Sequence, residues 1–150
     1  MESVDVGRSD PEEEMRIDGT VRGGCGGAGK IPEEAYITRC LAAGERLQRG
    51  TLNITVHELH AILAELGEPH FVCDGNNPDL GNFRWWRIRL ESPVLDESVP
   101  AFITRSVRSR ASYLEIMSTA HFRTLGLKDG DEVSLTVIHD LDQIEKSAQP

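Results

Sequence analysis

Alternation of apolar and polar residues predicts most of the regular structure in this chain. Leu52, Ile54 and Val56 alternate with Thr51, Asn53 and Thr55, which is typical of a half-buried β-strand with one apolar and one polar face. Further runs of β-branched and aromatic residues predict strands over 17–22, 71–73, 83–91, 99–104, 113–117 and 132–138. The Asp-Gly-Asp sequence at 129–131 is a turn signal that leads into the last of these strands.

Helical spacing occurs in two segments. Pro32 suits a first helical turn, and the acidic residues after it suit the positive end of a helix. The apolar residues that follow at roughly helical spacing are expected to face the core: Ile37, Cys40, Leu41 and Leu47. A second short helix is predicted from Leu59, Ile62, Leu63 and Leu66, and Gly67 can end it.

These elements predict a mainly β fold, a small and mostly antiparallel barrel with two or three short helices. The tryptophans of the strand 83–91 should point to opposite faces, so one of Trp85 and Trp86 enters the core. The other is a candidate surface for stacking a ligand ring, although packing is the simpler role for both.

The chain of 150 residues has room for one compact domain. Residues 1–15 form an acidic leader without apolar periodicity, which we expect to be disordered, and 139–150 resemble it as a flexible tail around the domain at 16–138. No apolar run reaches the roughly 20 residues of a membrane span, and the N-terminus lacks a signal sequence. We therefore expect a cytoplasmic monomer that does not bind membranes.

Cysteine and charge content restrict the possible chemistry. Cys25, Cys40 and Cys73 are odd in number and widely spaced, which favours free thiols over a disulfide framework or a zinc site. The net charge of −9 disfavours nonspecific nucleic-acid binding. Arginines are concentrated in the second half, where they either attract nucleotide phosphates or pair with surface carboxylates.

The sequence Gly50-Thr51-Leu52-Asn53 is the first candidate for chemistry. Alternate side chains of a strand share a face, so the hydroxyl of Thr51 and the amide oxygen of Asn53 can meet one ligand. A magnesium-bound phosphate suits such a pair, because Mg²⁺ prefers oxygen ligands. On this pattern alone, a strand threonine and a turn-stabilising asparagine are the simpler interpretation.

A glycine-rich segment at 23–29 is the second candidate. Gly24, Gly29 and Lys30 match most of a P-loop, but Ile31 stands where that motif needs Ser or Thr to hold magnesium. The chain also lacks the alternating strands and helices in which P-loops occur. Glycine nevertheless lets backbone amides approach phosphate closely, so the segment remains a candidate anion-binding loop or a turn without a ligand.

Together with a third block, these segments resemble the archaeal-type, CTP-dependent riboflavin kinases over about 17–138. The third block contains Leu114-Glu115-Ile116, followed by Phe122-Arg123 and Leu125-Gly126-Leu127-Lys128-Asp129-Gly130-Asp131. The resemblance implies a cradle-loop β-barrel that transfers phosphate from CTP to riboflavin with Mg²⁺ and forms FMN.

The resemblance also implies a role for each matching residue. Thr51 and Asn53 would ligate magnesium, and Glu115 would contact the flavin and help remove the proton of the attacking hydroxyl. The nucleotide would contact two segments, one of Gly24, Cys25, Gly26, Gly27, Ala28, Gly29 and Lys30, the other of Ala120, His121, Phe122 and Arg123.

Several positions depart from the family pattern. Gly27 replaces a glutamate, Ala28 replaces a glycine, and Lys30 would compensate as a point charge on phosphate. Val107 stands where a threonine contacts the flavin, and Ser106 or Ser109 is the candidate substitute. A noncatalytic nucleotide- or flavin-binding descendant of the family is therefore the alternative, and a DNA-binding barrel is third because the chain is acidic.

Overall fold

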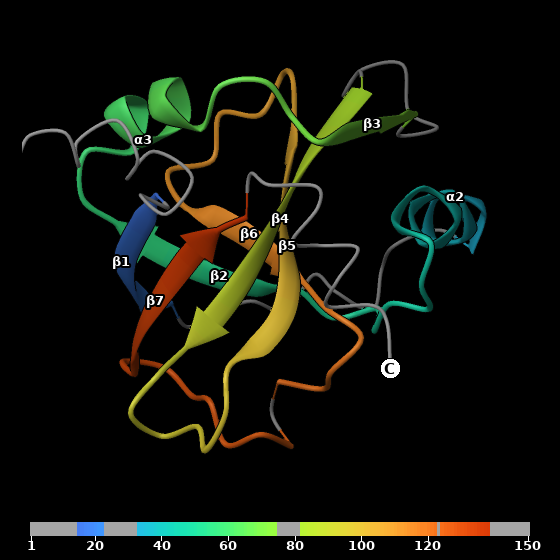
Figure 1. Ribbon diagram of the computed structural model, residues 1–150. Helices are drawn as coiled ribbons and strands as arrows, with labels where there is room; N and C mark the ends of the chain where they lie inside the picture. Colours follow the sequence, from blue (N-terminus) through green and yellow to red (C-terminus); the bar gives the residue numbers. More distant parts are fainter. Residues whose placement is uncertain (1–14, 23–32, 75–81, 123, 139–150) are drawn as a thin grey trace, which may run out of the picture.

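The computed structural model describes residues 15–22, 33–74, 82–122 and 124–138. Within these residues seven strands and two helices follow one another along the chain (Figure 1). Their bounds are β1 Arg16–Val21, α2 Glu33–Ala43, β2 Leu52–Val56, α3 Leu59–Leu66, β3 Phe71–Asp74, β4 Asn82–Glu91, β5 Val99–Ser106, β6 Leu114–Met117 and β7 Glu132–Val137. The predicted strands and both predicted helices are confirmed within a few residues.

Six of the strands close into an antiparallel barrel. The strand order is β3-β4-β5-β6-β2-β1-β7, and β4 also pairs with β7. The six strands β4, β5, β6, β2, β1 and β7 therefore form a ring, and β3 pairs with β4 outside it. Ile88 opposes Val137 and Leu90 opposes Leu135 where the ring closes. Closure leaves no open edge among the six strands of the ring. The prediction of a small, mainly β barrel with few helices is therefore confirmed.

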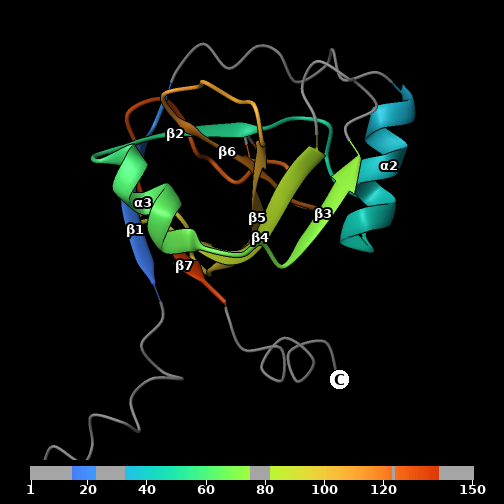
Figure 2. The same ribbon diagram turned by 90° about the horizontal axis from the view of Figure 1, so that it is seen from above.

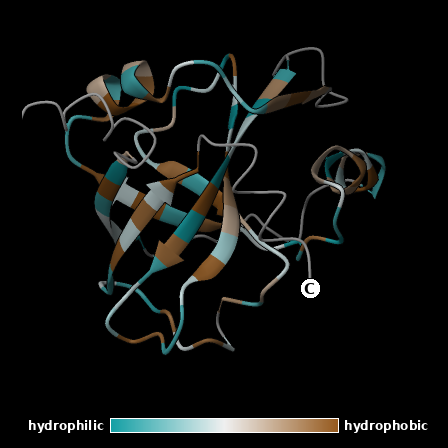
Figure 3. Ribbon diagram, viewed as in Figure 1, coloured by the Kyte–Doolittle hydropathy of each residue, from teal (hydrophilic) through white to brown (hydrophobic). Residues whose placement is uncertain are grey.

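The barrel interior is the main hydrophobic core. Apolar residues of successive strands point inward, among them Ile54, Ile103, Ile116 and Trp86, each at most 1% exposed. Alternation of apolar and polar residues is visible along β4 in Figure 3. Gly19 allows β1 to approach β2 closely, because a Cβ atom at this position would lie 2.4 Å from Cγ2 of Ile54. Helix α3 adds Leu66 to this core and lies over the upper end of the barrel in Figure 1.

A second apolar cluster lies outside the barrel, beneath α2 and β3. It contains Phe83, Trp85, Phe102 and Met117, together with Leu47 after α2. The Trp85 ring stacks on Phe71 at a centroid distance of 5.5 Å and meets Phe102 edge to face. Trp85 and Trp86 do point to opposite faces as predicted, and both are buried in packing. Neither ring is available as a surface for stacking a ligand.

The predicted core face of α2 is wrong for Ile37 and Leu41, whereas Cys40 packs against the outer cluster as expected. Ile37 and Leu41 are 47% and 77% exposed, whereas the buried residues of the helix are Ala35, Arg39 and Ala43. The outer face of the barrel already carries large side chains here, so the helix packs through two alanines and inserts the long side chain of Arg39 between them. Figure 2 shows α2 beside β3, outside the barrel. Leu47 is buried as expected.

The two predicted glycine positions at the end of α3 and before β7 agree with the structure. Gly67 ends α3 with a φ of +66°, and Gly130 turns the chain into β7 with a φ of +91°. Neither cysteine of the described residues, Cys40 or Cys73, forms a disulfide. Among the described residues, no helix has the length and apolar content that crossing a membrane requires.

Candidate functional site

Three polar side chains form a row across neighbouring strands. Asn53 of β2 is directly opposite Glu115 of β6, and Glu115 is directly opposite Thr104 of β5. Side chains that are directly opposite in an antiparallel pair lie on the same face of the sheet. This face is the outside of the barrel, because the neighbouring residues on each strand, such as Ile54, Ile103 and Ile116, fill its interior. We call Asn53, Glu115 and Thr104 the polar row.

The predicted magnesium ligands lie at the β2 end of the row. Thr51 donates its hydroxyl to Oδ1 of Asn53 over 3.4 Å, so the two side chains share a face as predicted. Mg²⁺ holds octahedral oxygen ligands at about 2.0–2.1 Å, which places neighbouring ligand oxygens about 3 Å apart. The two oxygens therefore fit adjacent positions of a magnesium ion, and their neutrality would leave most of the charge balance to phosphate.

Glu115 occupies the middle of the row and is half-buried. Burial raises the pKa of this carboxyl, while the positive charges of Arg39 and Arg105 oppose the increase. No ion pair between Glu115 and an arginine forms within the described residues. A carboxylate whose charge is destabilised in this way accepts a proton more readily than one at the surface.

Arg39 reaches the row from α2, and the sequence did not indicate it. Its guanidinium carbon lies 4.3 Å from the centroid of the Phe83 ring, and Nη1 donates to the sulfur of Met117 over 3.7 Å. The side chain is 9% exposed, and its buried Nε has no hydrogen-bond partner among the described residues. Burial lowers the pKa of Arg39, whereas Cys73 and Glu115 raise it. The available signal was the spacing of Ala35, Arg39 and Ala43, which places them on one helical face.

Thr104 is the second residue that the sequence did not identify. It is 1% exposed, and its buried hydroxyl oxygen has no partner among the described residues. Ser106, the candidate substitute for the missing flavin contact, lies two residues along β5 on the same face and accepts the backbone N–H of Arg108. Val107 is 48% exposed and offers no hydroxyl.

The predicted nucleotide segment follows β6. Gln48 anchors its start, because the backbone N–H of Gln48 donates to the carbonyl of Ser118 over 2.8 Å. Ala120 packs against the barrel core, and Phe122 belongs to it with 8% exposure, so the Phe122 side chain is committed to packing. His121 is exposed, and its Nδ1 accepts the backbone N–H of Thr124. Arg123 lies outside the described residues.

The predicted glycine segment, Gly24, Cys25, Gly26, Gly27, Ala28, Gly29 and Lys30, also lies outside the described residues. The residues before and after it are placed close to the row. Arg22 donates its backbone N–H to the carbonyl of Asn53 over 2.9 Å, and Glu33 forms an ion pair with Arg49, two residues before Thr51. The described residues on both sides of the glycine segment therefore contact residues 49–53.

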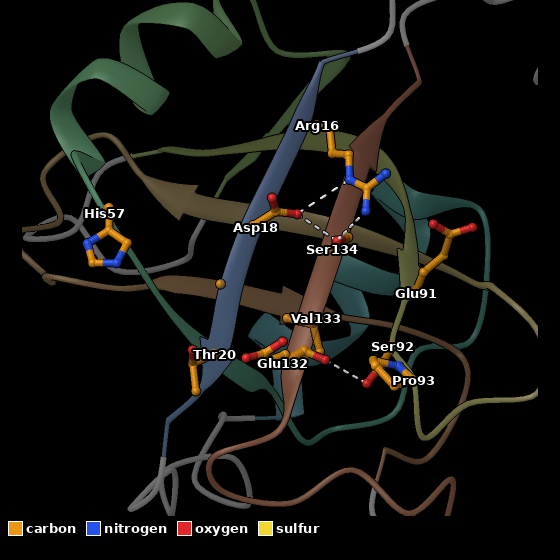
Figure 4. A pocket seen from close by; sticks show the side chains of 11 residues that line it. Arg16, Asp18, Thr20, His57, Glu91, Ser92, Pro93, Glu132, Val133 and Ser134 are labelled. Carbon is orange, nitrogen blue, oxygen red and sulfur yellow. Dashed lines mark hydrogen bonds and ion pairs between the residues drawn. The ribbon is translucent and has the colours of Figure 1, made fainter.

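A cavity of about 580 Å³ lies on another part of the barrel. Figure 4 shows Arg16, Asp18 and Ser134 pointing toward one another within it, on β1 and β7. Ser134 donates to Asp18 over 2.6 Å, and this bond is the main reason why the pKa of Asp18 is lowered. These polar groups satisfy one another, and Glu91 and Glu132 add negative charge. The cavity is therefore a poor site for phosphate, and we place the candidate site at the polar row.

Comparisons with known proteins add no further assignment. No model of a protein family matches the sequence, and no curated protein matches it either.

Proposed function

We propose that this protein transfers the terminal phosphate of CTP to the terminal ribityl hydroxyl of riboflavin and forms FMN. The polar row carries the proposal. Asn53 and Glu115 are 62 residues apart in the sequence, and the resemblance assigns one to the metal and the other to the flavin; the register of β2 and β6 makes them direct neighbours. A phosphoryl donor and its acceptor must meet in this way.

Each residue of the proposed site has a separate task. Thr51 and Asn53 hold Mg²⁺, which, when bound, neutralises phosphate charge and helps orient the nucleotide. Glu115 accepts the proton of the ribityl hydroxyl as its oxygen bonds to the terminal phosphorus of CTP and the bond from that phosphorus to the bridging oxygen breaks. CDP leaves, and FMN carries the phosphate.

The surroundings of Glu115 support its role as a base. A general base is most effective when its pKa lies close to the working pH, and burial moves the pKa of Glu115 upward toward neutrality. The remaining acceleration comes from holding the reactants in line and from neutralising charge, rather than from a covalent intermediate.

We place this activity in the cytoplasm, in a monomer without a nucleic-acid partner.

The alternative is a noncatalytic protein that binds a nucleotide or flavin. Val107 is the observation that favours it, because this exposed side chain offers no hydroxyl where the resemblance implies a flavin contact. Loss of such a contact would weaken the binding of riboflavin more than the binding of the nucleotide.

The experiment is an assay of FMN formation. Purified full-length protein is incubated with Mg²⁺, riboflavin and either CTP or ATP, and FMN is separated from riboflavin by chromatography with fluorescence detection. We expect FMN with CTP and less with ATP. Equal or faster turnover with ATP contradicts the choice of donor, and nucleotide binding without FMN from any donor favours the noncatalytic alternative.

A further inference from the structure

Two buried polar groups beneath α2 have no partner among the described residues. These are Nε of Arg39 and the hydroxyl oxygen of Thr104, and both side chains are more than nine-tenths buried. Buried polar groups in folded proteins almost always have a hydrogen-bond partner, and a buried charge is costly unless it is paired. A pair of such groups in one place requires an explanation.

The register of the sheet brings the two groups together. Arg39 contacts Met117 on β6 and Phe83 on β4, on either side of β5. Met117 is opposite Phe102 of β5, and Phe83 is opposite Ser106. Thr104 lies between Phe102 and Ser106 on the same face, so the line between the two contacts of Arg39 crosses β5 at Thr104. The register therefore places the guanidinium near Thr104, without a hydrogen bond between the two.

The partners that Arg39 does have are not anions. A thioether sulfur is a weak acceptor, and a ring face attracts a cation without neutralising it. Neither ion pair of the described residues involves Arg39. A guanidinium with an unpartnered N–H near a hydroxyl group supplies donors of the kind that bind the oxygen atoms of phosphate.

We propose that Arg39 and Thr104 form a subsite for a phosphate group, reached from the side of half-buried Glu115. The subsite itself does not require the proposed activity. Its assignment to the phosphate of FMN or of the nucleotide rests on the proposed function, because the subsite adjoins Glu115 in the polar row.

Inorganic phosphate is the probe that tests the subsite without catalysis. Isothermal titration of the full-length protein should show phosphate binding that weakens at least about tenfold in Arg39→Gln, because a charge-assisted hydrogen bond is lost. Arg46→Gln is the matched control, since Arg46 is an exposed arginine just after α2, and this variant should bind like the parent. Equal weakening in both variants, or no binding by the parent protein, overturns the proposal.

If Arg39→Gln does not fold, Thr104→Val and Glu115→Gln test the phosphate subsite in its place. Thr104→Val should weaken phosphate binding while the melting temperature stays the same or rises, because it removes an unpartnered buried hydroxyl without changing the shape of the side chain. Glu115→Gln should tighten phosphate binding, since it removes a negative charge directly opposite Thr104. Unchanged phosphate affinity in both variants contradicts the subsite.

Competition experiments identify the source of the phosphate. Displacement of inorganic phosphate by FMN, but not by riboflavin, assigns the subsite to the product, and displacement by CTP but not by FMN assigns it to the donor. Phosphate binding in a protein that forms no FMN refutes the proposed kinase and leaves the subsite intact. FMN formation by a protein in which Arg39→Gln changes neither phosphate binding nor turnover refutes the subsite alone.

Discussion

Glu115 occupies a position in which burial acts against its charge. Burial raises the pKa of the carboxyl, and the two nearby arginines, Arg39 on α2 and Arg105 on β5, offset this effect only in part. The folded protein therefore binds a proton at Glu115 more tightly than the unfolded chain does. Stability gained from this proton is present at low pH and is lost as the pH rises from the ordinary carboxyl value of 4.5 through the raised pKa.

The pH dependence of stability tests the surroundings of Glu115. Glu115→Gln keeps the shape of the side chain and removes its charge, so the variant should gain stability relative to the parent protein as the pH rises through that window. Urea denaturation of both proteins at a series of pH values measures the difference in unfolding free energy. A difference that does not change with pH would mean that the pKa of Glu115 is not raised in the folded state.

Thr51 and Asn53 are the residues that test the metal assignment. Thr51→Val and Asn53→Ala should each lower magnesium-dependent FMN formation at least about tenfold, because loss even of an outer-shell partner commonly costs this much. Their circular dichroism spectra should be unchanged, since both side chains lie on the outer face of the barrel rather than in its interior.

Thr55→Val is the matched control for the metal assignment, because Thr55 is exposed on the same strand. It should retain normal activity. Full magnesium-dependent turnover in both Thr51→Val and Asn53→Ala would remove these residues from the metal site. Unfolding of both variants would show that their role is structural.

At the scale of elements, the sequence predicted which segments form strands and helices better than it predicted which face of α2 is buried. Alternation in 51–56 identified β2 because each strand residue meets either the interior or the outside. In α2, Ile37 and Leu41 were the stronger apolar signals, yet the helix packs through Ala35, Arg39 and Ala43. The size of the side chains already on the outer face of the barrel decides this, and no local pattern contains that information.

Two leucine-to-alanine substitutions test the orientation of α2. Leu41→Ala should change the unfolding free energy by no more than about 0.5 kcal/mol, because Leu41 is 77% exposed. Leu47→Ala removes the same atoms from a side chain that is 1% exposed and should cost about 2–5 kcal/mol. Thermal or urea denaturation measures both values. Equal losses, or a larger loss for Leu41→Ala, would mean that α2 presents its other face to the barrel.

At the scale of the whole molecule, pairing between strands that are distant in the sequence turns separate sequence signals into one candidate site. The predicted class of fold followed from many short strands without alternating helices, but the pairing of β4 with β7 joins residues about 45 positions apart and has no local signature. The same is true of the polar row. Asn53 and Glu115 were predicted separately, whereas Thr104 was found only from the register of β5 and β6.

The location of the ligands is the most direct test of this account. Amide chemical shifts of the full-length protein are recorded by NMR as Mg²⁺ and CTP, and then riboflavin, are added. We predict that the perturbed amides belong to 51–54, 103–106 and 114–117, around the polar row, and that those of Asp18, His57 and Ser134 in the cavity of Figure 4 stay unchanged. Shifts confined to that cavity, or no shifts with either ligand, would contradict the polar row as the site of phosphate transfer.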